Sequence, residues 1–145
     1  MGKSIAVFNQ KGGVGKTTTN VNLSASIGKL GKKVLVLDMD PQGNTTSGYG
    51  IDKDNIENTI YEVIIENLDI RDAIIKTEFE NIDIIPSASE LSGAEIELAN
   101  EKDREFKLRN SLYKIKDQYD YIFIDCPPSL GMLTINCLTA VNSVL

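Results

Sequence analysis

Residues 10–18 combine glycines, lysines and threonines in the order Q-K-G-G-V-G-K-T-T. Glycines between an apolar run and a helical segment allow several backbone N–H groups to converge on one small volume, at the positive end of the helix dipole. Lys16 adds a positive charge and Thr17 a hydroxyl, which suits a polyphosphate with its Mg²⁺ ion. The usual pattern is G-x-x-x-x-G-K-S/T, and its first place falls on Gln10 rather than glycine. A glycine-rich turn can also close an ordinary strand–helix corner, but this composition favours a phosphate-binding loop.

Two carboxylates follow the apolar run Val34–Leu37, where the sequence reads D-M-D-P-Q-G-N. Ligands of parallel sheets bind beyond the carboxyl ends of the strands. Asp38 and Asp40 are therefore expected on the same edge of the sheet as the glycine-rich loop. Asp, Pro, Gly and Asn also favour turns, and turn formation accounts for Pro41 and Gly43. We interpret the two carboxylates as functional groups opposite a Mg²⁺-binding loop.

A further acid, Asp125, ends the apolar run Tyr121–Ile124. Four apolar strand residues followed by an acid are typical of a carboxylate that holds Mg²⁺, often through water. Many buried strands end in Asp, so this pattern alone does not indicate a Mg²⁺ site. It does so here because the same chain contains the phosphate-binding loop. Cys126 comes next and is interpreted as a packing residue, since cysteine behaves as a small hydrophobe.

The elements that position these groups alternate between strands and helices. Apolar runs without alternation, as expected of strands buried on both faces, occupy residues 4–9, 34–37, 82–85 and 121–124. Predicted helices cover residues 15–30, 59–66, 72–76, 89–100, 102–117 and 133–140, with a surface loop at 45–54. Gly31 is placed to end the first helix, Pro86 puts the strand before it towards a sheet edge, and residues 144–145 begin another strand. The order predicts an α/β fold, a mostly parallel sheet with helices on both faces, in a single domain over residues 1–145.

The amino-acid composition limits the kinds of ligand and catalysis that this chain can support. The chain has 145 residues, 41% of them apolar, and a net charge of −6. Residues 50–105 hold 16 of its 21 acids, an acidic surface that is unsuited to nucleic acid. There is no histidine, so a general base must be a carboxylate or lysine, and metal binding by oxygen favours Mg²⁺ over zinc. Two cysteines are too few for a disulfide framework. No run reaches the ~18 apolar residues of a membrane helix, and the first residues leave no space for a signal peptide.

Three motifs in order, K-G-G-V-G-K-T-T, D-M-D-P-Q-G-N and Y-I-F-I-D-C-P-P, resemble those of the ParA/Soj partition ATPases, which carry the deviant phosphate loop of the ParA/MinD superfamily. The resemblance covers essentially the whole chain. It implies a three-layer P-loop NTPase fold and Mg²⁺-dependent hydrolysis of ATP to ADP and phosphate. It also implies that the strand of Asp125 lies between the strand of Asp38 and the first strand. The third strand is then outermost beyond Asp38, and the strand at Val144 flanks the first strand.

The same resemblance implies a role for each motif residue. Thr17 would bind Mg²⁺ directly, Asp38 and Asp125 would hold it through water, and Asp40 would position the attacking water. Lys16 would act on the bound phosphates, and Lys11 would reach the phosphates of the other subunit. The phosphate-binding residues implied in this way are Lys11, Gly12, Gly13, Val14, Gly15, Lys16, Thr17 and Thr18.

By the same resemblance, ATP binding closes two copies into a face-to-face homodimer that binds DNA non-specifically, and a centromere-binding ParB/Spo0J-like protein stimulates hydrolysis. The protein would be cytoplasmic and nucleoid-associated, without membrane binding. Members of the family are longer, so we expect the C-terminal strands of the domain to be absent here. The first strand would then lie at or near a sheet edge, through which the chain self-associates.

Two alternatives are a nucleotide-binding regulatory module that hydrolyses nothing and a MinD-like membrane-cycling ATPase. The second requires a terminal amphipathic helix, and the segment ending at Leu145 lacks the basic face of such a helix.

Overall fold

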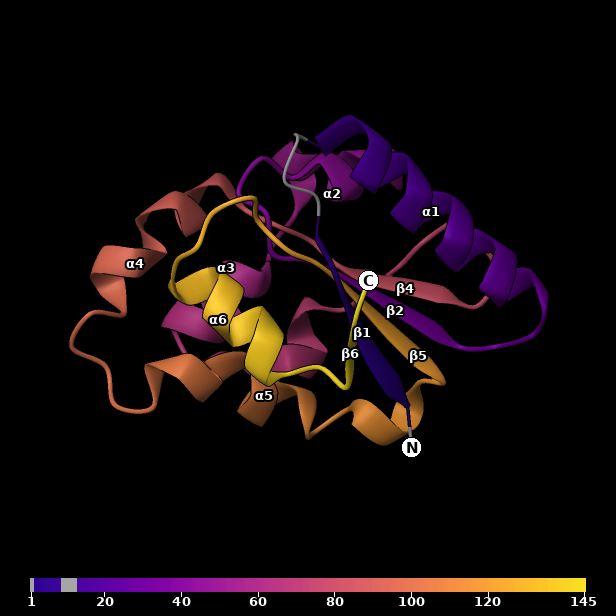
Figure 1. The fold of residues 1–145 in the computed structure, drawn as a ribbon. Coiled ribbons are helices and arrows are strands. Elements are labelled where there is room, and N and C mark those ends of the chain that lie inside the picture. Colours follow the sequence, from indigo (N-terminus) through magenta and orange to yellow (C-terminus); the bar gives the residue numbers. More distant parts are fainter. Residues whose placement is uncertain (1, 9–12) are drawn as a thin grey trace.

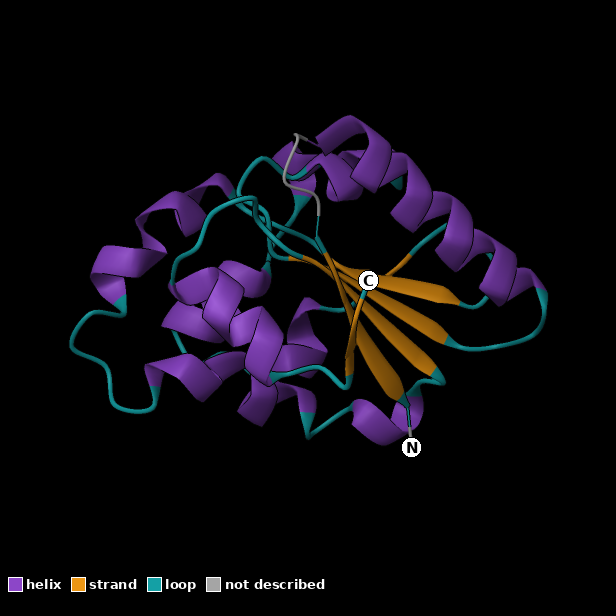
Figure 2. Ribbon diagram, in the orientation of Figure 1, coloured by secondary structure: helices purple, strands orange, loops and turns teal. Residues whose placement is uncertain are grey.

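A six-stranded sheet forms the centre of the computed structural model, which describes residues 2–8 and 13–145, without the side chains of 13–20. The strand order is β3-β4-β2-β5-β1-β6, and every pair is parallel except β3 with β4. This order confirms the expected place of β5 between β2 and β1. Figure 2 shows the strands in orange at the centre, with helices on both sides of them. The strands are β1 (Lys3–Val7), β2 (Val34–Asp38), β3 (Ile75–Lys76), β4 (Ile82–Ile85), β5 (Tyr121–Asp125) and β6 (Ser143–Val144).

Helices cover both faces of the sheet (Figure 1). α1 lies on one face, where its apolar residues pack against one row of strand side chains; on the other face α3, α5 and α6 pack against the alternate row. In β2, for example, Val34 and Val36 belong to the first core, and Leu35 and Leu37 to the second. Successive strand side chains point to opposite faces, so an uninterrupted apolar run serves two cores. The helices are α1 (Gly13–Lys29), α2 (Asn44–Gly48), α3 (Ile60–Ile65), α4 (Ala94–Glu97), α5 (Lys107–Leu112) and α6 (Met132–Thr139).

The long helix predicted over residues 102–117 is wrong. The segment contains a 3₁₀ turn at Arg104–Phe106, α5, and another 3₁₀ turn at Lys116–Gln118. The side chain of Asn136 in α6 accepts a hydrogen bond from the Leu108 N–H (3.1 Å) and donates one to the Arg104 carbonyl (2.8 Å). A continuous helix would join these two backbone groups to each other. The Asn136 amide replaces that bond, so tertiary packing overrides the helical periodicity.

Three other predicted segments also differ from the structure. Residues 72–76 are predicted as a helix. In the structure the first two of them end the 3₁₀ turn Ile70–Ala73, and the last two form β3, which pairs antiparallel with β4. β4 is therefore not outermost, because β3 pairs with its outer side. Pro86 lies beyond Ile85, where β4 ends, so it does not interrupt this pairing. The helix predicted over residues 89–100 is shorter and follows a 3₁₀ turn at Ser89–Gly93. The loop predicted at 45–54 overlaps α2, which begins directly after Gly43, a residue with φ 66°.

β1 lies next to the edge of the sheet rather than on it. β6 pairs with β1 over Ile5 and Ala6, and the Leu145 N–H donates to the Ala6 carbonyl (2.8 Å). The Phe8 N–H in turn donates to the Leu145 carbonyl (3.3 Å). β6 thus covers the outer side of β1 and is itself the outermost strand, with Val144 and Leu145 exposed.

Candidate functional site at the carboxyl edge of the sheet

The carboxyl ends of β1, β2 and β5 meet at one edge of the sheet. Asp38 at the end of β2 is directly paired in register with Asp125 at the end of β5, and Val7 of β1 is paired with Asp125 on its other side. α1 begins at Gly13, six residues after β1 ends, and its first turn lies over this edge (Figure 1). The motifs of the sequence are therefore brought together by the strand order.

Some of the predicted phosphate-binding residues lie outside the part of the chain that the structure describes. Lys11 and Gly12 lie outside the described residues, whereas Gly13, Val14, Gly15, Lys16, Thr17 and Thr18 form the first turns of α1. The helix thus begins two residues earlier than predicted. Its first N–H groups have no acceptor within the helix and lie at the positive end of the dipole, which is the arrangement that binds anions.

Asp38 is fully buried and held by three donors. Its Oδ1 accepts the Asp40 N–H (3.1 Å), and its Oδ2 accepts the N–H (2.9 Å) and the hydroxyl (2.7 Å) of Thr46. Burial, followed by the negative charge of Asp125, raises the pKa of Asp38 to about 7, against a usual 3.8, although the hydrogen bonds act in the opposite direction. Two buried carboxylates side by side are thus costly for the protein to ionise.

Asp125 is 1% exposed, and its Oδ2 accepts a hydrogen bond from the Thr45 hydroxyl (2.5 Å). Thr45 and Thr46 are consecutive residues of α2, and both are fully buried. The first turn of α2 therefore lies against the ends of β2 and β5 and supplies one hydroxyl to each carboxylate.

Asp40 is 5% exposed and lies in a turn just beyond β2. Its Oδ1 accepts the Gln42 N–H (3.0 Å), and its carbonyl accepts the Gly43 N–H (2.9 Å) and the Ser87 hydroxyl (2.5 Å). Asp40 therefore shares the turn chemistry that the sequence assigned to Pro41 and Gly43. A cavity of about 660 Å³ opens beside this turn, between Pro41–Gly43 and residues 87–90.

The sequence did not identify Thr45, Thr46 or Ser87 as site residues. Thr45 and Thr46 fell in a predicted loop, and Ser87 follows β4 with no motif around it. The available signal was positional: polar residues after the carboxyl ends of parallel strands lie at the edge where ligands bind.

The donor set fits Mg²⁺. This ion is held by one or two protein carboxylates, together with phosphate oxygens and water. Asp38 and Asp125 supply two carboxylates in register, and a divalent cation between them and a phosphate would offset the like-charge repulsion that raises the pKa of Asp38.

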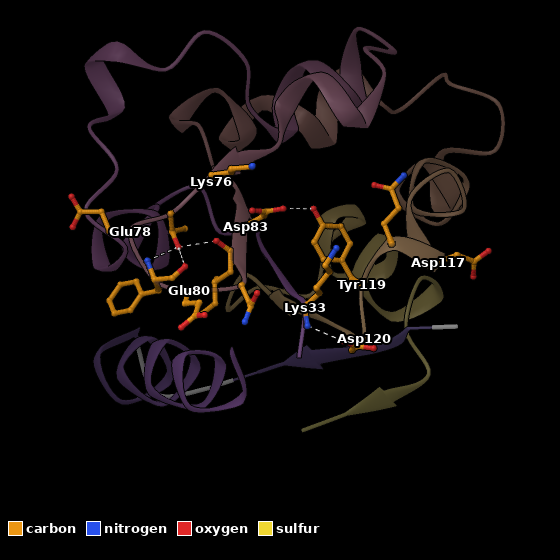
Figure 3. Close-up of a pocket in the computed structure, with 13 residues that line it drawn as sticks. Lys33, Lys76, Glu78, Glu80, Asp83, Asp117, Tyr119 and Asp120 are labelled. Carbon is orange, nitrogen blue, oxygen red and sulfur yellow. Dashed lines mark hydrogen bonds between the residues drawn. The ribbon is translucent and has the colours of Figure 1, made fainter. Parts of the chain in front are cut away.

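A larger hollow, of about 810 Å³, lies at the opposite edge of the sheet (Figure 3). Lys33, Asn81 and Asp120 line it, and each directly precedes a strand. Its polar groups bond to one another: the Tyr119 hydroxyl donates to Asp83 (2.7 Å), and the Lys33 N–H donates to Asp120 (2.8 Å). This hollow is thus separated from the acidic pair by the length of the strands.

The mostly parallel sheet, its strand order and the helix that follows β1 define the fold of a P-loop NTPase. A family model described as AAA domain (AAA_31) matches residues 2–145, and the chain belongs to this family. It is 55% identical over 145 residues to the sporulation initiation inhibitor protein Soj of Bacillus subtilis and 50% identical to the chromosome partitioning protein ParA of Myxococcus xanthus. All of this chain is covered in both matches, but only 57% and 51% of those proteins. The chain thus spans about half the length of these relatives.

Solved structures show the same fold. Cobyrinic acid a,c-diamide synthase of Mycobacterium smegmatis with bound ADP and magnesium superposes with a TM-score of 0.93 and 40% identity, over 99% of this chain and 58% of that one. A putative plasmid partition protein of Borrelia burgdorferi bound to AMPPNP gives a TM-score of 0.83 and 35% identity, over 99% and 61%. Separately, none of the helices in the described part of the chain has the length and hydropathy needed to span a lipid bilayer.

Proposed function

We propose that this chain is the Mg²⁺-dependent, ATP-hydrolysing part of a DNA-partition ATPase. The observation that carries the proposal is the buried carboxylate pair, Asp38 and Asp125, paired in register at the edge of the sheet where α1 begins. Support comes from relatives that are partition proteins and from similar structures that hold ADP and magnesium or AMPPNP. We further propose that residues 1–145 fold as one domain.

Each group has a distinct role in this proposal. The first N–H groups of α1 bind phosphate oxygens, and Lys16 neutralises their charge. The hydroxyl of Thr17 and the carboxylates of Asp38 and Asp125 hold Mg²⁺, which neutralises phosphate charge when it is bound. Asp40 orients the water that attacks the terminal phosphate.

The remaining proposals concern the whole protein. ATP binding closes two copies face to face, with Lys11 reaching the nucleotide of the partner copy. The closed homodimer binds DNA non-specifically, and a centromere-binding protein of the ParB/Spo0J type accelerates hydrolysis. The protein acts in the cytoplasm, on the nucleoid. Homology to Soj and ParA supports these steps, and they are proposals because the match covers about half of those relatives.

Binding of a fluorescent ADP analogue and steady-state ATP hydrolysis, each with and without Mg²⁺, test the function. The unmodified chain is expected to bind the analogue and to hydrolyse ATP only with Mg²⁺. Lys16→Ala is expected to lose both, because the charge that pairs with the phosphates is removed. Lys29→Ala, an exposed lysine in the last turn of the same helix, is the matched control and should retain both.

Two results would contradict parts of the proposal. Binding without hydrolysis would identify a nucleotide-binding regulatory module. Unchanged binding by Lys16→Ala would overturn the assignment of the phosphate loop itself.

A further inference from the structure

Four hydrogen bonds form a closed ring that starts at one oxygen of Asp38 and returns to the other. Oδ1 of Asp38 accepts the Asp40 N–H (3.1 Å), and the Asp40 carbonyl accepts the Ser87 hydroxyl (2.5 Å). The Ser87 N–H donates to the Thr46 hydroxyl oxygen (3.0 Å), and that hydroxyl donates to Oδ2 of Asp38 (2.7 Å). We call these four residues the Asp38 ring.

The Asp38 ring joins three segments: the end of β2, the first turn of α2 shortly after it, and the loop after β4, whose Ser87 lies 41 residues beyond Thr46. Its four residues are between 0% and 5% exposed. Hydrogen bonds in such a low-dielectric interior are stronger than those at the surface, and chains of them reinforce one another. Short Ser and Thr side chains also lose little rotamer freedom on burial compared with longer polar ones. The geometry of the ring is therefore well fixed.

Both peptide groups that flank the Cα of Asp40 belong to the ring. The N–H on one side is held by Asp38, and the carbonyl on the other is held by Ser87 as well as by the Gly43 N–H. Fixing both peptide groups fixes the direction in which the Asp40 side chain leaves the backbone. Ser87 and Thr46 do this through Asp40's main chain and through Asp38.

We propose that Thr46 and Ser87 are positioning residues that fix Asp40 relative to Asp38, so that a change at the Asp38 carboxylate is transmitted around the ring to the loop after β4. This inference rests on the proposed roles of Asp38 and Asp40. It adds two residues, on two further segments, to the machinery that sets the hydrolysis step.

The first test needs no hydrolysis. In ¹⁵N-labelled chain, backbone amide signals are followed as Mg²⁺ is added in the presence of ADP. In the unmodified chain, the Met39 and Ser87 signals both shift. In Thr46→Val, which keeps the shape but lacks the hydroxyl, the Met39 signal still shifts and the Ser87 signal does not. Thr46→Ser restores the Ser87 response, because it restores the hydroxyl.

The second test uses the hydrolysis rate. Ser87→Ala is expected to lower kcat about 10- to 100-fold, as small misplacements at reacting centres do, while KM for ATP changes less than about twofold. Ser89→Ala removes a hydroxyl from an exposed serine two residues further on, at the start of the 3₁₀ turn, and should match the unmodified chain. Circular dichroism of each variant confirms that the chain is folded.

The outcomes separate the two proposals. A Ser87 amide that responds equally in Thr46→Val, or a kcat of Ser87→Ala equal to that of Ser89→Ala, would overturn the positioning role. If the unmodified chain binds Mg²⁺ and ADP but hydrolyses nothing, the catalytic part of the proposed function fails, and the amide response alone still decides whether the Asp38 ring transmits the change.

Discussion

The buried carboxylate pair predicts how the stability of the metal-free chain depends on pH. The pKa of Asp38 is raised from 3.8 to about 7 in the folded chain, chiefly by burial and then by the charge of Asp125. A raised pKa means that the folded state favours the protonated carboxyl. The folded state therefore gains its full stabilisation from this proton below pH ~4, the ordinary pKa of an aspartate. This stabilisation is lost as the pH rises through about 7, the pKa of Asp38 in the folded chain.

The size of the effect follows from the same values. One pKa unit corresponds to about 1.4 kcal/mol, so moving the pKa from 3.8 to about 7 corresponds to about 4 kcal/mol of unfolding free energy. This is a large share of the roughly 5–15 kcal/mol that stabilises a typical domain. Most of it should be lost between pH ~4 and pH ~8, and Mg²⁺ with ADP should oppose the loss by stabilising the ionised pair.

Urea unfolding in EDTA, followed by circular dichroism from pH 4.5 to 8.5, measures the effect. Asp38→Asn has no titrating group at this position, so the free energy of the unmodified chain should fall relative to that of Asp38→Asn as pH rises. Asp117→Asn, at an exposed position, controls for the loss of one surface charge and should run parallel to the unmodified chain. Parallel curves for the unmodified chain and Asp38→Asn would refute the reasoning.

Four further predictions concern single residues. Asp40→Ala should lower kcat about 10²–10⁴-fold and leave ADP affinity nearly unchanged, as steady-state kinetics and titration will show; equal losses in both would contradict its proposed role. Lys11→Ala should weaken ATP-dependent dimerisation as well as hydrolysis, and sedimentation that is unaltered by the substitution would remove the role across the interface. Thr59→Ala breaks the capping box of α3, in which the Thr59 hydroxyl accepts the Tyr61 N–H (3.1 Å), and should cost about 1 kcal/mol in urea unfolding. Val144→Lys should reduce any self-association through the β6 edge in sedimentation without ATP, because a charge on an edge strand opposes pairing.

The strands were predictable because burial on both faces leaves a local signature. Ile82–Ile85 was predicted with the bounds that the structure shows, and the residues that end β2 and β5 follow from the same apolar runs. Once the strands are parallel, their carboxyl ends must share an edge, so the neighbourhood of Asp38 and Asp125 was also predictable. The strand order itself came from the family resemblance rather than from the local pattern.

The errors arose where distant side chains replace local bonds. Asn136 interrupts a helix more than twenty residues before it in the chain, and its effect is invisible in the periodicity of residues 102–117. Thr46 and Ser87 are ordinary polar residues until β2 and β4 become neighbours, which brings the two side chains together. Such contacts depend on the sheet having formed, so no local pattern contains them.

The position of β5 between β1 and β2 also bears on how the chain acquires its shape during synthesis. β1 and β2 are made first but have no ladder with each other, because β5 lies between them and pairs with both. A nascent chain can therefore form α1 and pair β2 with β4 early, whereas the sheet around the two acids cannot close until residue 125 has left the ribosome. Until then β1 and β2 lack the strand that lies between them, and such unpaired strand edges are the condition under which partly made α/β proteins associate wrongly. β5, which supplies Asp125 to the site, is thus also the strand that covers the unpaired edges of β1 and β2 once it is made.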